Sequence, residues 1–252
     1  MAIGENVSVQ VTAILFLATI VRSAFGFGEA LVAVPLLALV IPVNVAAPVA
    51  VLVSITVALI VVIQDWRHVH VRSAGWLVLS AVLGIPLGLL LLKVVAEPIV
   101  KAGLAIVIIV FSFYSLLTRR RHELTSDAWA PVFGFSSGIL GGAYGMNGPP
   151  LVIYGSLRRW SPERFRATLQ GYFLIASLIG MGGYWLTGLW TPAVSRFYLL
   201  SLPIVFVAIF VGRTINSRMN AGRFFLYVHA GLILIGAILL FQAFQLSGSL
   251  NH

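Results

Sequence analysis

The segment Gly141-Gly-Ala-Tyr-Gly-Met-Asn-Gly-Pro-Pro150 interrupts an apolar stretch that extends from residue 128 to 157. Gly26-Phe27-Gly28-Glu29 interrupts a second apolar stretch, from 9 to 41. Glycine favours turns and proline removes a helical hydrogen bond, so neither stretch is expected to form one straight helix. The arm that follows each break is too short to cross a bilayer, since a span needs about 20 apolar residues. Each stretch therefore predicts a re-entrant hairpin that enters the membrane and returns to the same face.

Six uninterrupted apolar runs have the length of membrane spans. They lie at approximately 44–64, 74–92, 99–117, 166–187, 196–213 and 224–244. The composition agrees, because 60% of the residues are hydrophobic and only 9% are charged, whereas a soluble domain carries about 25% charged residues. A soluble globular fold is excluded, and we predict an all-α polytopic membrane protein embedded in a lipid bilayer.

The two broken stretches are related by an offset of 119 residues, which aligns Ala24 with Ala143 and Gly26 with Gly145. The order of elements also repeats, since each broken stretch is followed by three clean spans. The expected units are a first repeat at 1–118, a basic cytoplasmic linker at 119–127 and a second repeat at 128–252. A unit with three full spans is inverted when it is repeated, and inverted repeats with broken helices are typical of secondary transporters.

The distribution of charge favours the hairpin topology. The chain has 16 Lys and Arg against 7 Asp and Glu, and its cations lie in short clusters between apolar runs. This is the pattern of membrane-flanking charge and not of a nucleic-acid interface. With two hairpins, twelve cations lie on one face and three on the other, whereas eight simple spans divide them nine against six. Because cytoplasmic loops collect Lys and Arg, the hairpin model is preferred and places both termini outside.

The two hairpin tips are predicted to form an anion site. Each returning arm begins at its tip, so two short helices direct their N-termini, with free N–H groups and the positive end of the dipole, toward the membrane midplane. Asn147 is expected to cap the second arm and Pro149 to occupy its first turn. The alternative is that the glycines only build tight turns in a crowded bundle. The candidate substrate-binding residues are Arg22, Gly26, Phe27, Gly28, Gly145, Met146, Asn147, Gly148, Arg166 and Gln170.

Arg22 and Glu29 are charged residues inside apolar stretches, where charge is costly and usually functional. Arg22 lies one helical turn before the first tip and is expected to attract the anion. Glu29 lies beside the anion site and is expected to carry a proton coupled to transport. The alternative is an ion pair between the two that holds the hairpin closed. Arg166, one turn before Gln170 on the same face, either gates or binds the anion or only determines topology.

Three motifs resemble those of the sulfite exporter TauE/SafE family. They are Gly-Phe-Gly-Glu-Ala-Leu-Val-Ala-Val-Pro at 26–35, Gly-Met-Asn-Gly-Pro-Pro-Leu-Val-Ile-Tyr at 145–154 and Arg-Phe-Arg-Ala-Thr at 164–168. The resemblance implies a permease of the bacterial inner membrane for sulfite, sulfonates and related organic anions. The first motif departs from the commoner form, which has a glycine run, by carrying Glu29.

Other functions were weighed against this interpretation. No ATPase motif is present, so a coupling proton or cation, or the anion gradient itself, is expected to drive transport, and a passive anion channel is the alternative within transport. With no cysteine in the chain and only His68 and His70 close together, we expect no cofactor and no metal. Gly134-Phe-Ser-Ser-Gly138 matches G-x-S-x-G and, with His229, permits an intramembrane Ser–His hydrolase. A nucleophile elbow needs a strand-to-helix turn, so we expect no enzyme.

Overall fold

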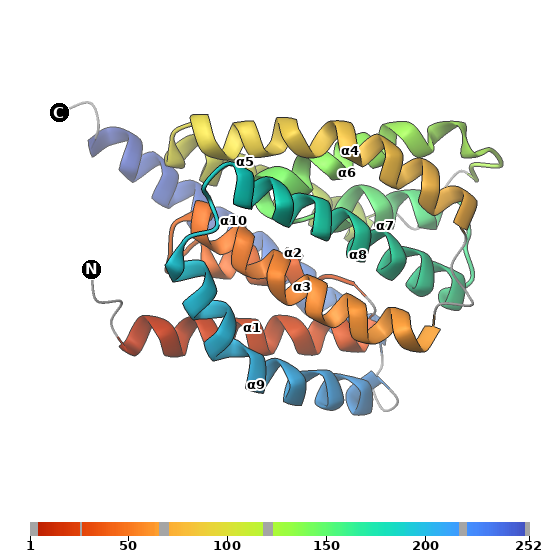
Figure 1. Ribbon diagram of the computed structural model, residues 1–252, viewed down its shortest axis with the longest axis horizontal. Helices are drawn as coiled ribbons and strands as arrows, with labels where there is room; N and C mark the ends of the chain where they lie inside the picture. Colours follow the sequence, from red (N-terminus) through yellow and green to blue (C-terminus); the bar gives the residue numbers. More distant parts are fainter. Residues whose placement is uncertain (1–4, 26, 66–70, 118–122, 217–220, 250–252) are drawn as a thin grey trace.

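The computed structural model describes residues 5–25, 27–65, 71–117, 123–216 and 221–249, and every regular element in these ranges is helical. The helices form one elongated bundle (Figure 1). In chain order they are α1 Glu5–Phe25, α2 Glu29–Leu37, α3 Val43–Asp65, α4 Val71–Val94, α5 Glu97–Leu117, the 3₁₀ helix η2 Asp127–Trp129, α6 Ala130–Tyr144, α7 Gly148–Leu157, α8 Pro162–Leu186, α9 Pro192–Asn216 and α10 Ala221–Ser249. This architecture confirms the prediction of an all-α polytopic fold.

Both broken stretches are pairs of helices, and the breaks fall where glycine and proline predict them. The backbone turns through positive φ at Gly28 (95°) and Gly145 (63°), a conformation that glycine adopts without steric cost. The returning arms α2 and α7 have 9 and 10 residues. Both are too short to cross a bilayer.

The described residues contain six helices that are long and apolar enough to cross a membrane. Five of them, α3, α4, α5, α9 and α10, coincide with predicted spans. The predicted span at 166–187 is the 25-residue helix α8, but it falls outside this set, because Gln170 and its several glycines lower its hydropathy. The sixth is Glu5–Ala24 of α1, so the entering arm of the first stretch has full span length, which the sequence analysis did not anticipate. The reason is that α1 begins at Glu5, before the apolar stretch starts.

Helices α4 and α6 pack with their backbones in contact. Five glycines lie along this contact, two on α4 and three on α6: Gly84, Gly88, Gly134, Gly138 and Gly142. A Cβ atom at any of them would clash with a backbone carbonyl oxygen of the partner helix. Small residues of this kind allow close helix approach in membranes. Elsewhere α1 packs on α9, α3 on α8 and α5 on α10.

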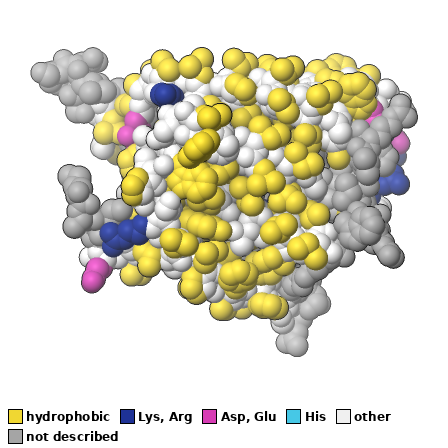
Figure 2. Space-filling model, in the orientation of Figure 1, with side chains coloured by type: hydrophobic (Ala, Val, Ile, Leu, Met, Phe, Trp, Pro, Cys, Tyr) yellow, Lys and Arg dark blue, Asp and Glu magenta, His cyan; other side chains and the backbone are white. Residues whose placement is uncertain are grey.

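Apolar side chains form a band around the bundle. In Figure 2 hydrophobic side chains cover the middle of the visible face, and the Lys, Arg, Asp and Glu side chains lie toward its two ends. Leu83, Val110, Phe210 and Phe241, from four different helices, are each 62–69% exposed. Such a surface is unfavourable in water and suits a lipid environment. The protein is therefore a multi-pass membrane protein.

The linker lies at the same end of the bundle as the connection between α7 and α8. Leu124 N–H donates to the carbonyl of Leu157 (2.9 Å), and Arg158 pairs with Asp127 (3.2 Å). Helix α1 begins and α10 ends toward the other end (Figure 1). The sequence analysis places the linker and this connection on one face; residues 119–122 themselves lie outside the described residues.

Candidate functional site

One cavity lies between the two hairpin tips. Phe27, Gly28 and Glu29 of the first tip line it together with Gly145, Asn147 and Gly148 of the second. Other lining residues come from the surrounding helices and include Arg22, Ser54, Phe111, Val152 and Phe173. The cavity has a volume of about 20 Å³, which is room for about one water molecule. The structure therefore brings both predicted tips to one small internal space.

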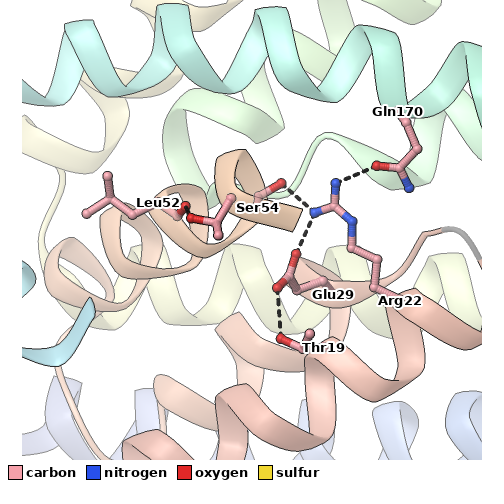
Figure 3. Close-up of polar contacts among 7 residues, drawn as sticks. Thr19, Arg22, Glu29, Leu52, Ser54 and Gln170 are labelled. Carbon is pink, nitrogen blue, oxygen red and sulfur yellow. Dashed lines mark hydrogen bonds and ion pairs between the residues drawn. The ribbon is translucent and has the colours of Figure 1, made fainter. Parts of the chain in front are cut away.

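Arg22 is the centre of a buried polar network at this cavity (Figure 3). Its Nη1 donates to Glu29 Oε2 (2.5 Å) and to Ser54 Oγ (2.7 Å), and its Nη2 donates to Gln170 Oε1 (2.7 Å). Arg22 and Glu29 are only 3% and 2% exposed. The four side chains belong to α1, α2, α3 and α8, so one guanidinium joins both halves of the chain. The ion pair that the sequence analysis held as an alternative is present.

Two further contacts complete this network. Thr19 Oγ1 donates to the second carboxylate oxygen of Glu29 (3.2 Å). The guanidinium carbon of Arg22 lies 5.5 Å from the centre of the Phe173 ring, within the range of a cation–π contact. Two buried polar atoms of residues that line the cavity nevertheless remain without a partner: Arg22 Nε and Asn147 Oδ1, the latter lying against Gly141 of α6. Such atoms are costly to bury and can bond to a ligand.

The two tips offer unequal numbers of backbone donors. Helix α2 begins with Glu29, Ala30 and Leu31, which all line the cavity and all carry an N–H. Helix α7 begins with Gly148 followed by two prolines, which have no N–H to donate. Most of the backbone N–H donors of the two helix N-termini therefore come from α2.

The prediction that Asn147 caps α7 through its side chain is wrong. Asn147 occupies the position before the helix, but its side chain makes no capping hydrogen bond. Its backbone is already helical (φ −72°, ψ −15°), whereas a capping side chain reaches the helix N–H groups from an extended backbone. Pro149 does occupy the first turn, as predicted.

The backbone of the second tip is held by hydroxyl groups of neighbouring helices. Ser137 Oγ donates to the carbonyl of Asn147 (2.7 Å), and Tyr172 OH donates to Ser137 Oγ (3.0 Å). Tyr184 OH donates to the carbonyl of Gly142 (2.9 Å). These bonds fix the end of α6 against α8.

The remaining predicted site residues have different positions. Met146 is fully buried in the apolar core and does not line the cavity. Gln170 lies behind Arg22, which it holds by a hydrogen bond. Gly26 lies outside the described residues, and the side chain of Arg166, on α8, is likewise not described.

Sequence reasoning missed Thr19, Ser54, Phe111 and Phe173 at this site. The available signal for the first two is a hydroxyl group inside an apolar helix, which in a membrane often bonds to a neighbouring helix. The two phenylalanines carry no comparable signal, because aromatic residues are common throughout the spans.

The hydrolase alternative needs the motif serine Ser136 to pair with His229, and the structure gives these two residues different partners. Ser136 Oγ donates to the carbonyl of Val132 in its own helix. His229 on α10 lies instead against α5, with its Nδ1 3.3 Å from Ser112 Oγ and its ring packed on Phe111. The same residues hold no cluster of three or more His, Asp or Glu that could bind a metal ion. His68 and His70 lie outside the described residues.

A family model described as sulfite exporter TauE/SafE matches residues 11–240. The chain belongs to the sulfite exporter TauE/SafE family. The match covers both halves of the chain and both tips, so the resemblance carried by the three motifs is confirmed. TauE/SafE proteins are membrane transporters of sulfite- and sulfonate-type anions and not enzymes. No curated protein and no solved structure matches the chain.

Proposed function

We propose that this TauE/SafE protein is a secondary transporter that moves a small anion by alternating access around the two hairpin tips. The substrate is sulfite, an organosulfonate or a related organic anion. The observation that carries the proposal is the cavity that both tips line, with the buried Arg22 at its wall. The protein resides in a bacterial inner membrane with both termini outside, as the charge distribution favours.

Two inverted repeats underlie this mechanism, and the helix boundaries support them. An offset of 119 residues relates three pairs of helix boundaries. These are the ends of α1 and α6 (25 and 144), the starts of α2 and α7 (29 and 148) and the starts of α3 and α8 (43 and 162). Helices also pack across the two halves in matching pairs. Helix α1 of the first half packs on α9 of the second, and their counterparts α6 and α4 likewise pack on each other. This exchange is expected when a two-fold relation connects the repeats.

The cavity supports a bound anion that also has an apolar part. Cationic and polar groups on its wall come from Arg22, Ser54, Asn147 and the start of α2. Apolar surface comes from Phe27, Phe111, Val152 and Phe173. Because the open space holds about one water molecule, the helices around it must separate to admit a sulfonate. A closed site of this kind favours a carrier over a channel, which needs a continuous pore.

Glu29 is the group proposed to carry the coupled proton. Among the described residues, its charged neighbour is Arg22 on α1, and its contacts from α1 also include the neutral Thr19. From α10, His229 faces Phe111, which lines the same cavity. When a monoanion binds at Arg22 and Glu29 takes up a proton, the cavity wall and the bound anion together keep the net charge of the empty cavity. This pairing avoids an uncompensated charge in the membrane.

Transport into proteoliposomes tests the proposal. Purified protein is supplied with labelled taurine, sulfoacetate or sulfite, under an imposed pH gradient and with or without a protonophore. Accumulation above the external concentration that the protonophore abolishes supports a proton-coupled carrier. Equilibration without accumulation at every gradient supports the passive channel instead, and no movement of any of these anions contradicts the proposed substrate class.

A further inference from the structure

We propose that the carboxylate of Glu29 takes the place of the transported anion at Arg22 until the substrate binds. In the structure this carboxylate accepts a hydrogen bond from Arg22 Nη1, the bond that a substrate oxygen accepts instead when the substrate binds. The substrate class follows from this exchange: a singly charged oxyanion such as a sulfonate or hydrogen sulfite. This inference rests on the proposed function, because it describes the same cavity.

The three hydrogen-bond acceptors around Arg22 differ in charge. Ser54 Oγ and Gln170 Oε1 are neutral, while the carboxylate of Glu29 is the one anionic acceptor that the described contacts give to the guanidinium. Bonds between two ionised groups are the stronger ones, and a sulfonate oxygen accepts the same kind of N–H bond. An anion that enters the cavity repels the Glu29 carboxylate and competes with it for the one cation, whereas the two neutral acceptors are not repelled.

Arg22 is also held in place by hydrogen bonds that do not involve Glu29. Ser54 lies on α3 and Gln170 on α8, and each holds one nitrogen of the guanidinium at 2.7 Å. Glu29 is the first residue of α2, directly after the turn at Gly28, and lies at the tip itself. The cation can therefore stay in place while its anionic partner is exchanged.

Thr19 can form a hydrogen bond with Glu29 whether Glu29 is ionised or protonated. Thr19 Oγ1 is 3.2 Å from Glu29 Oε1. A hydroxyl group donates to a carboxylate and accepts from a carboxylic acid, so Thr19 holds Glu29 before and after it is displaced and protonated.

The charge of the cavity selects the class of anion. Among the described lining residues, Arg22 and Glu29 are the charged ones, and together they are neutral. One negative charge in place of the Glu29 carboxylate leaves the cavity neutral, whereas a dianion adds an uncompensated charge to a buried site. Methanesulfonate should therefore bind more tightly than sulfate.

Calorimetric titration of the full chain in detergent, at one pH, tests the proposal with methanesulfonate and sulfate as probes. Glu29→Gln removes the competing charge at nearly constant shape, so methanesulfonate affinity should rise at least about tenfold, the scale of one charge-assisted hydrogen bond. The double variant Arg22→Gln/Glu29→Gln is the matched control and should lose this gain. Gln170→Glu adds a second carboxylate at Nη2 and should lower the affinity about tenfold or more, which gives an independent test if Glu29→Gln does not fold.

The outcomes separate this inference from the proposed function. A folded Glu29→Gln protein with unchanged or weaker methanesulfonate binding overturns the inference and leaves the carrier intact. An unchanged affinity in Gln170→Glu, or sulfate binding as tight as methanesulfonate in the native protein, overturns it as well. A native protein that binds neither probe contradicts the proposed function, and the inference with it.

Discussion

Substitution of Gly148 by leucine tests whether the cavity between the tips binds the substrate. Gly148 lines the cavity, and a Cβ atom built on it meets nothing within 4 Å. The backbone there has no positive φ, so a leucine is accommodated without strain at the turn. Its isobutyl group is larger than the cavity, which has room for about one water molecule, so it fills the site and presses on the side chains that line it. The fold should survive at the cost of overpacking, about 1–3 kcal/mol, while the site is filled.

The expected loss is large because an occupied cavity excludes the anion altogether. We expect methanesulfonate affinity to fall at least about 100-fold, equivalent to about 2.7 kcal/mol, and proteoliposome uptake of taurine to fall to background. The melting temperature should fall by only several degrees, since a helix-propensity gain of at most about 1 kcal/mol offsets part of an overpacking cost of about 1–3 kcal/mol.

The matched control is Gly182→Leu, at an exposed glycine of α8 that also has open space around it. This variant should keep native binding and uptake. Gly145→Leu is a poorer choice, because Gly145 has positive φ and its Cβ would lie 2.9 Å from the carbonyl oxygen of Ala47. Native affinity in a folded Gly148→Leu protein would refute the cavity as the substrate site.

Three further predictions follow from other parts of the molecule. Glu29→Gln mimics the protonated acid, so substrate binding should persist and lose its pH dependence while gradient-driven accumulation in proteoliposomes stops; accumulation with the native pH profile would eliminate the proton-carrier role. Single cysteines introduced at positions 120 and 159 should react with an impermeant reagent from the same side of the membrane, and labelling from opposite sides would favour eight simple spans. Gly88→Leu should lower stability by about 1–3 kcal/mol or prevent folding, because its side chain enters the backbone of α6; a thermal melt like that of the native protein would show that this contact is looser than described.

Much of the fold can be predicted from the sequence, but little of the hydrogen-bond network around Arg22 can. Gly28, Gly145 and Pro149 act locally, through φ and a missing N–H, so the helix breaks they cause are readable from the chain. The partners of Arg22 are not local, since Ser54 and Gln170 lie 32 and 148 residues away. Only tertiary packing decides which polar residue of another helix reaches a given guanidinium.

The capping role expected of Asn147 failed for a related reason. A preference for asparagine before a helix is a statement about residue type, and the backbone angles at that position decide whether the side chain can reach the helix N–H groups. In this tip the side chain is left with an unpartnered oxygen that lies against Gly141 of α6.

The contact between α4 and α6 also determines which tip is free to move. Two backbones that mesh through five glycines cannot slide along each other, because any axial shift drives carbonyl oxygens into the opposite chain. Helix α6 ends at the second tip, so that tip is anchored to α4 as one rigid piece. The first tip is attached to α1, whose contact with α9 includes one such glycine, Gly212. A change of access from one face to the other is therefore expected to displace the first hairpin, with Glu29 at its tip, against a stationary second one.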